Sequence, residues 1–107
     1  MDSTPWKEQE LINNDTDAKK RFELKHDGDT AFIDYMISKQ GIIYLTHTEV
    51  PPQWEGKGVG SALISKTLDF ITETQLKMAP LCPFVAAFLK RHPERAVGIL
   101  APGYSVA

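Results

Sequence analysis

The 107-residue chain has little cysteine and no long apolar run, and each shortage excludes a class of protein. Cys82 is the only cysteine, so no disulfide can form within the chain and no metal site can be built on cysteine pairs. His26, His47 and His92 lack the spacing typical of paired metal ligands. No apolar run approaches the roughly 18 residues that a membrane-spanning helix needs. Residues 1–17 carry no apolar signal core. We therefore expect a cytoplasmic protein without a metal or a membrane anchor.

The chain also lacks an excess of positive charge. Its formal net charge is −2 at pH 7, and no long basic stripe is present, so nucleic acid is not an expected partner. The basic cluster at 19–21 is best interpreted as solvated surface, whereas the cluster at 90–92 is considered below. Composition and length are typical of one globular domain with one core. We expect residues 1–17 to be a polar lead-in and residues 18–107 to form that domain.

The order of the local signals predicts a mixed α/β domain. Residues rich in β-formers alternate with turn signals such as Asp27-Gly28, which favours an antiparallel meander of three strands, Arg21–Lys25, Thr30–Ser38 and Ile42–Val50. Pro51 and Pro52 end the third strand because proline has no N–H to donate.

Helical periodicity follows the third strand. A helix is expected over residues 61–74. Together with Val59, which lies just before this range, its apolar side chains fall on one half of the helix: Val59, Leu63, Ile64, Leu68, Phe70 and Ile71. A fourth strand is expected over Leu76–Cys82, and the strand–helix–strand order makes it parallel to the third. Pro83 is suited to begin a second helix that ends near Arg91, and Val97–Leu100 is a candidate final strand.

The stretch Gln53–Gly60 (QWEGKGVG) has three glycines at alternate positions between the third strand and the first helix. Glycine lets the backbone approach an anion closely, and a helix N-terminus favours negative charge. A Walker A loop would need Ser or Thr where this chain has Gly58, and a dinucleotide fingerprint would need G-x-G-x-x-G. A nucleotide-binding domain is therefore a weaker alternative, as is a flexible loop without a ligand. We expect the backbone N–H groups of residues 54–61 to bind a phosphate.

Two polar residues occur near the end of the third strand. Simple alternation along that strand places Ile43, Leu45, His47 and Glu49 on one face. His47 is a candidate for proton transfer because histidine exchanges a proton near neutral pH. Glu49 is either a second candidate for the catalytic base or an ordinary carboxylate where the strand end emerges into solvent.

Cys82 directly precedes the predicted second helix and is expected to be its N-cap. A helix N-terminus stabilises a thiolate, which is the reactive form of cysteine. The strands carrying His47 and Cys82 are expected to be parallel, so the imidazole and the thiol are expected to lie together at one sheet edge. The alternative is a small buried apolar side chain.

Three motifs together carry a family resemblance: His47-Thr48-x-Val50, then Gln53-x-x-Gly56-x-Gly58-x-Gly60, and then Leu81-Cys82-Pro83-Phe84-Val85. From about residue 21 to residue 95 the chain resembles the small stand-alone GNAT-like proteins of the YjdJ type. The resemblance implies the GNAT fold, a mixed central sheet with splayed parallel strands and flanking helices, and it implies that acetyl-CoA binds between those strands. The residues that it assigns to the cofactor are Thr48, Val50, Gln53, Trp54, Glu55, Gly56, Lys57, Gly58, Val59, Gly60 and Ser61.

The resemblance further implies an acetyl-CoA-dependent N-acetyltransferase with His47 and Cys82 as the catalytic residues. Cys82 is expected either to accept the acetyl group or to give a proton to the departing CoA thiolate. The acceptor is an unidentified amine, on a protein or on a small molecule. Larger GNAT enzymes often place a tyrosine acid where this chain has Leu89, which favours the alternative of an acyl-CoA-binding or sensing module with little catalysis. Residues 90–92 are either near the 3′-phosphate of CoA or solvated surface.

Overall fold

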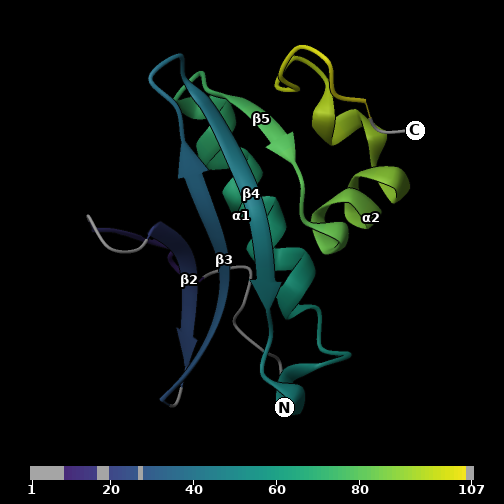
Figure 1. Cartoon of the computed structure of the whole chain (residues 1–107). Coiled ribbons are helices and arrows are strands. Elements are labelled where there is room, and N and C mark those ends of the chain that lie inside the picture. Colours follow the sequence, from purple (N-terminus) through teal and green to yellow (C-terminus); the bar gives the residue numbers. More distant parts are fainter. Residues whose placement is uncertain (1–8, 17–19, 27, 106–107) are drawn as a thin grey trace.

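Strands that follow one another in sequence lie side by side in one mixed sheet (Figure 1). The computed structural model describes residues 9–16, 20–26 and 28–105, and within them the sheet has five strands. The first four pair antiparallel with their neighbours and the last pairs parallel with the fourth; they are β1 (Ile12–Asp15), β2 (Lys20–His26), β3 (Asp29–Ile37), β4 (Ile42–Glu49) and β5 (Lys77–Pro80). The predicted antiparallel meander is confirmed and corresponds to β2, β3 and β4. The strand predicted to follow the first helix is also confirmed, since it is β5 and lies parallel to β4. Asp27 of the predicted turn lies outside the described residues, and Gly28 beside it has a φ of 82°.

Strand β1 lies within the segment expected to be a polar lead-in, so the sheet begins earlier than the sequence indicated. Three of its four residues, Asn13, Asn14 and Asp15, have little β-propensity, and the strand is mostly exposed, which left no periodic signal. Contacts made by its asparagines attach the strand to the sheet. Tyr35 donates a hydrogen bond of 2.8 Å from its hydroxyl to Asn13, and Asn14 donates one of 3.2 Å to Glu23. The Tyr35 ring also stacks on Phe22, with the ring centroids 4.5 Å apart.

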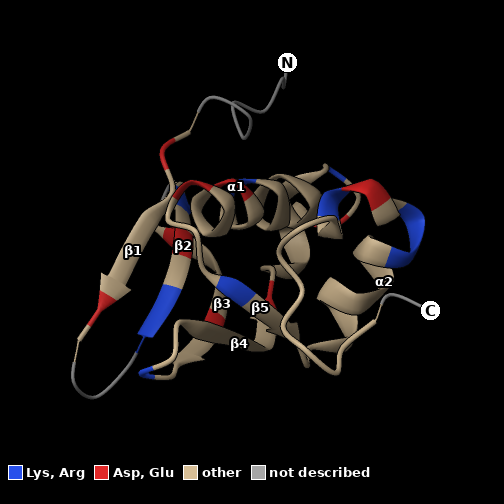
Figure 2. Ribbon diagram, turned by 90° about the horizontal axis from the view of Figure 1, so that it is seen from above, with Lys and Arg blue, Asp and Glu red and all other residues tan. Residues whose placement is uncertain are grey.

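Helix α1 (Val59–Glu73) crosses one face of the sheet, and helix α2 (Pro83–Arg91) lies beside β5 (Figure 2). The predicted apolar side of α1 is confirmed except for Phe70, which is only half-buried. Thr67 is buried as well, and its hydroxyl is satisfied there by a hydrogen bond of 2.8 Å that it donates to the carbonyl of Leu63. No described helix is long and apolar enough to cross a membrane.

The segment after α2 differs from the prediction of a final strand. Residues Pro93–Ala96 form a 3₁₀ helix, η3, and extended pairing is limited to a parallel bridge between Met78 and Leu100. Gly98 has a φ of 81°, which interrupts any extended run across 97–100. Strand β5 is likewise shorter than the predicted Leu76–Cys82, since it ends at Pro80.

Tyr35 makes the stability of the fold depend on pH in the alkaline range. Burial raises the pKa of its phenol above the ordinary value of 10.0, and the nearby Asp15 carboxylate adds to this effect. A raised pKa in the folded state means that the unfolded chain loses this proton first. The contribution of Tyr35 to stability is therefore complete below pH 10 and is lost as the pH rises through the folded-state pKa. Urea unfolding between pH 8 and 11 should show a steeper loss of stability for the wild type than for Tyr35→Phe. Equal slopes for the two proteins would contradict this account.

Candidate active site

A pocket of about 790 Å³ opens where β4 ends and α1 begins. Its wall includes the end of β4, the glycine-containing loop, the first turn of α1 and one side chain of α2: Thr48, Glu49, Val50, Pro52, Trp54, Glu55, Gly56, Gly58, Val59, Gly60, Ser61 and Phe84. All the residues that the sequence assigned to a cofactor are in this wall except Gln53 and Lys57. Gln53 instead donates a hydrogen bond to Asp29, and Lys57 is exposed. Glu49, Pro52 and Phe84 also line the pocket and were not assigned to the cofactor from the sequence.

Two of the three alternating glycines are required by backbone conformation. Gly56 has a φ of 80° and Gly58 a φ of 82°, a region that other L-residues rarely adopt. A Cβ at either position would meet no atom within 4 Å, so space is not the constraint there. These conformations turn the chain from the short 3₁₀ helix η2 (Pro52–Trp54) into α1, whose N-cap is Gly58. The helix therefore begins two residues before the expected start at Ser61.

Gly60 is in close contact with the side chain of Phe84. A Cβ at this position would lie 2.6 Å from Cζ of Phe84, a separation that non-bonded carbon atoms do not tolerate. The side chain of Phe84 therefore packs over the first turn of α1, and both residues contribute to the pocket wall.

The first turn of α1 presents its backbone N–H groups at this pocket. The N–H of Ala62 bonds to the carbonyl of Gly58 at 3.0 Å, and the N–H groups that precede it, from Val59 to Ser61, come before that first bond of the helix. Among the described residues, no side chain caps this end of α1 and no acidic residue occupies its first turn. Such a helix N-terminus attracts anions because free N–H groups and the helix dipole act together.

An extra residue in β4 decides which side chains reach the pocket. Asp34 of β3 pairs with His47, while the next residue, Tyr35, pairs with Leu45, so Thr46 has no partner in the register. This is a β-bulge, and the Thr46 hydroxyl donates a hydrogen bond of 3.2 Å to the carbonyl of Asp34 across it. Because the bulge inserts one residue, side-chain alternation reverses after it.

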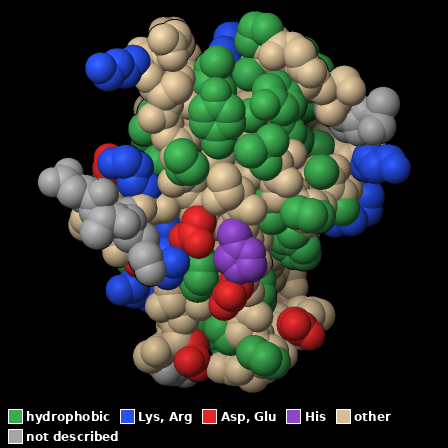
Figure 3. All heavy atoms as spheres, in the orientation of Figure 1, with side chains coloured by type: hydrophobic (Ala, Val, Ile, Leu, Met, Phe, Trp, Pro, Cys, Tyr) green, Lys and Arg blue, Asp and Glu red, His purple; other side chains and the backbone are tan. Residues whose placement is uncertain are grey.

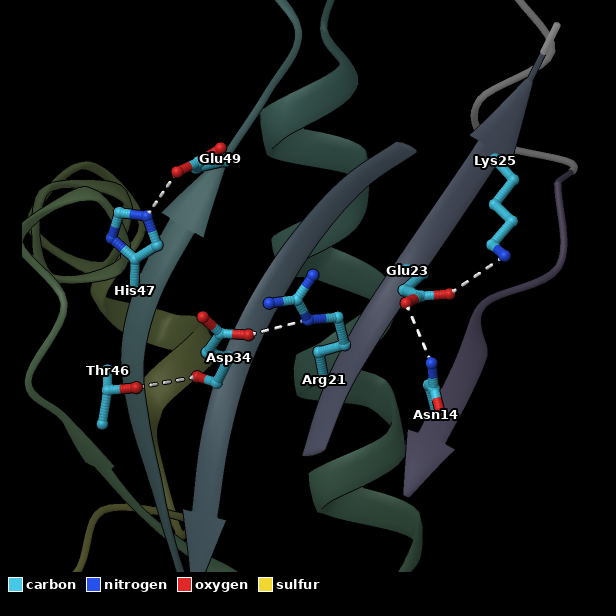
Figure 4. Close-up of polar contacts among 8 residues, drawn as sticks. All are labelled: Asn14, Arg21, Glu23, Lys25, Asp34, Thr46, His47 and Glu49. Carbon is cyan, nitrogen blue, oxygen red and sulfur yellow. Dashed lines mark hydrogen bonds and ion pairs between the residues drawn. The ribbon is translucent and has the colours of Figure 1, made fainter. Parts of the chain in front are cut away.

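The expectation that His47 and Glu49 share a face with Leu45 is therefore wrong. Leu45 is fully buried on the face covered by α1. His47 and Glu49 project from the opposite, open face, where an Nε2–Oε2 hydrogen bond of 3.0 Å joins them (Figure 4). Their side chains are 55% and 61% exposed, so both are accessible to a molecule arriving from solvent.

Other charged side chains on the open face are already paired. Arg21 donates a hydrogen bond of 2.9 Å from Nε to Asp34, and its guanidinium carbon lies 3.7 Å from the centre of the Phe32 ring. The His47 ring is tilted against the same phenylalanine, with the ring centroids 6.3 Å apart. Figure 3 shows a histidine side chain between acidic ones on this face, with hydrophobic side chains gathered toward the end of the sheet farther from the pocket.

Cys82 is the N-cap of α2, as predicted, but its partners differ from those expected. Its N–H donates a hydrogen bond of 2.8 Å to the carbonyl of Leu45, just beyond the last register pair of β4 and β5, Leu45 with Pro80. Its side chain is 3% exposed, and Sγ lies 3.2 Å from Oγ1 of Thr48. Thr48 reaches the sulfur because it follows the bulge and so points to the buried face. The contacts of Cys82 and His47 thus lie on opposite faces of β4.

No group of three or more potential metal-binding side chains occurs among the residues that the structure describes. Lys90 and Arg91 are exposed in the last turn of α2, at the end of the helix opposite to Cys82.

The roles of Gly60 and Phe84 can be separated by substitution. Gly60→Ala should destabilise the protein by about 0.5–1.5 kcal/mol, because the new methyl group forces the partly exposed Phe84 ring out of its preferred position. In a Phe84→Ala background the collision is removed, and the same change should be neutral or stabilising by up to about 1 kcal/mol, since alanine is favoured over glycine inside a helix. Urea unfolding of the four proteins measures both effects. An equal loss in the two backgrounds would contradict the packing argument.

Comparison with known proteins gives the family. The family described as GCN5-related N-acetyl-transferase matches residues 21–97. The chain is similar to Protein NATD1 of Gallus gallus, with 33% identity over 85 residues that cover 77% of each chain. It is also similar to Protein NATD1 of Mus musculus, with 31% identity over 77 residues that cover 70% of each chain. The human Protein NATD1 is 31% identical over 77 residues, covering 70% of this chain and 68% of the human one. The mixed sheet, the glycine-containing loop and these matches agree, and the chain belongs to the GCN5-related N-acetyltransferase family.

Proposed function

We propose that the protein transfers an acetyl group from acetyl-CoA to an amine. The observation that carries the proposal is the pocket, which extends from the free N–H groups at the start of α1 to Thr48, the residue in contact with Cys82. One end is suited to a diphosphate, and the other is bordered by Thr48, behind which the buried Cys82 thiol lies. Family membership supplies the reaction class of acetyl transfer.

The two ends of the pocket suit two parts of the cofactor, the diphosphate and the pantetheine arm. Backbone N–H groups of residues 59–61 would hold the diphosphate, since no side chain caps this end of α1 and they lie at the helix N-terminus. The backbone of Thr48 to Val50 would pair with the amide groups of the pantetheine arm. Trp54 and Phe84 supply apolar wall between these two regions.

The chemistry follows from the separation of His47 and Cys82. The amine nitrogen forms a bond to the thioester carbonyl carbon, and the carbon–sulfur bond to CoA breaks. His47, on the open face, accepts the proton that the amine loses, while Cys82, on the opposite face, gives its proton to the CoA sulfur. Exchange with solvent returns both groups to their starting states. Glu49 keeps the imidazole oriented through the hydrogen bond to Nε2.

A second candidate function is an acyl-CoA-binding module without catalysis. Leu89 favours it, because this α2 residue is apolar and only 1% exposed and so offers no acid at that position. Such a module would bind CoA as tightly as an enzyme and acetylate no amine. The experiments below separate the two functions.

Substitution of Cys82 tests the direct transfer. We expect the wild type to bind CoA in calorimetry and to acetylate at least one member of a panel of primary amines. Cys82→Ala should leave the dissociation constant for CoA within about twofold and lower kcat about a hundredfold, the lower end of what one general acid contributes. Cys82→Ser keeps a donor and should retain more activity than Cys82→Ala. An acetyl adduct on Cys82 in the intact mass would show transfer through the thiol instead, and undiminished turnover by Cys82→Ala would eliminate both routes.

Substitution of His47 tests the base. His47→Gln should lower kcat about a hundredfold or more while CoA affinity stays unchanged, because the side chain lies on the acceptor side of the sheet. Glu49→Gln should lower kcat less, since it weakens only the orientation of the imidazole. Glu73→Gln, an exposed carboxylate at the far end of α1, is the control and should match the wild type. Equal kcat values for His47→Gln and the control would exclude His47 as the base.

A further inference from the structure

Gln53 has a contact that its place in the glycine-containing motif did not indicate. Its side-chain Nε2 donates a hydrogen bond to Oδ2 of Asp29, with 2.5 Å between the two atoms. Asp29 is the first residue of β3, and in the register it is the partner of His26 at the end of β2. The end of the β2–β3 hairpin therefore contacts the loop that follows β4, since both lie at the same end of the sheet (Figure 1).

The next loop residue contacts the same hairpin end. The rings of Trp54 and His26 lie with their centroids 6.3 Å apart. Trp54 is 7% exposed and is also part of the pocket wall. Two consecutive residues of η2 are thus held by the two residues that flank the hairpin turn.

A continuous series of backbone hydrogen bonds links these contacts to the glycines. The N–H of Trp54 bonds to the carbonyl of Pro51 at 2.9 Å, that of Glu55 to Pro52 at 3.1 Å, and that of Lys57 to Trp54 at 3.3 Å. Gly58, the N-cap of α1, follows directly. Glycines at 56 and 58 have many accessible conformations, so contacts outside the loop are needed to select one of them.

The charge of Asp29 argues against a direct role in anion binding. A carboxylate beside a phosphate site opposes binding by like-charge repulsion. Its useful property is the oxygen that accepts the hydrogen bond from Gln53. We propose that Asp29 is a positioning residue for the cofactor loop and acts through Gln53. This inference rests on the proposed function, because it assumes that the loop binds CoA.

The two properties of Asp29 can be tested separately by calorimetry with CoA. Asp29→Ala removes the acceptor oxygen and should weaken CoA binding about threefold to tenfold, the equivalent of one ordinary hydrogen bond. Asp29→Asn keeps an acceptor oxygen and removes the charge, so it should bind CoA as tightly as the wild type or more tightly. Gln53→Ala should resemble Asp29→Ala, and the double variant should be no weaker than either single one. At saturating acetyl-CoA, kcat should be unchanged in all of them.

Asp15→Ala is the matched control. Asp15 is also an exposed strand aspartate and forms an ion pair with Lys20, but it lies on the edge strand β1. The Asp15→Ala substitution should leave the affinity for CoA unchanged. An independent readout without ligand is the pair of amide NMR signals of Gly56 and Gly58, which should move in Asp29→Ala and Gln53→Ala and stay in place in Asp15→Ala.

The outcomes distinguish this inference from the proposed function. Equal CoA affinity in the wild type and Asp29→Ala would overturn the inference alone, as would additive losses in the double variant or an Asp29→Asn variant as weak as Asp29→Ala. Failure of the wild type to bind CoA would overturn the proposed function, and this inference with it.

Discussion

The extra residue in β4 is the constraint on which the candidate site depends. Before Thr46, the strand follows ordinary alternation and buries Ile43 and Leu45 in the core. After it, alternation is reversed, so Thr48 points to the buried face and His47 to the open one. Without the bulge, the imidazole would point to the buried face and the Thr48 hydroxyl could not reach Cys82. Bulges recur beside active sites because they redirect side chains without ending the strand.

A second constraint acts on the loop, where three glycines serve two physical purposes. Gly56 and Gly58 allow positive φ angles that turn the chain into α1, whereas Gly60 leaves room for Phe84. The first purpose is local and depends on the loop alone. The second depends on α2, which follows β5, so the pocket is complete only when the parallel pairing of β4 and β5 has formed. The glycine-containing loop is therefore coupled to α2 through the contact between Gly60 and Phe84.

The sequence predicted those parts of the molecule that depend on local periodicity. Side-chain spacing placed the buried side of α1, and Pro83 marked the start of α2 with Cys82 as its N-cap. Strand β1 was missed because its polar residues are held by the distant Tyr35 and Glu23. The bulge was missed because threonine fits a regular strand as well as an irregular one, so the face of His47 was predicted wrongly. These features arise from tertiary pairing, which one sequence does not encode locally.

Separation of the two candidate catalytic groups changes how they can work together. A thiol activated by direct contact with an imidazole would need both on one face of β4, and the contacts of Cys82 and His47 lie on opposite faces. The pairing of β4 with β5 ends at Leu45 and Pro80. The edge of β4 beyond Leu45 is therefore not paired with β5, and a substrate could bind along it between the two groups. A thioester placed there would meet the thiol from one side and an amine from the other. In that arrangement the proposed reaction needs two independent proton transfers, and neither group has to activate the other.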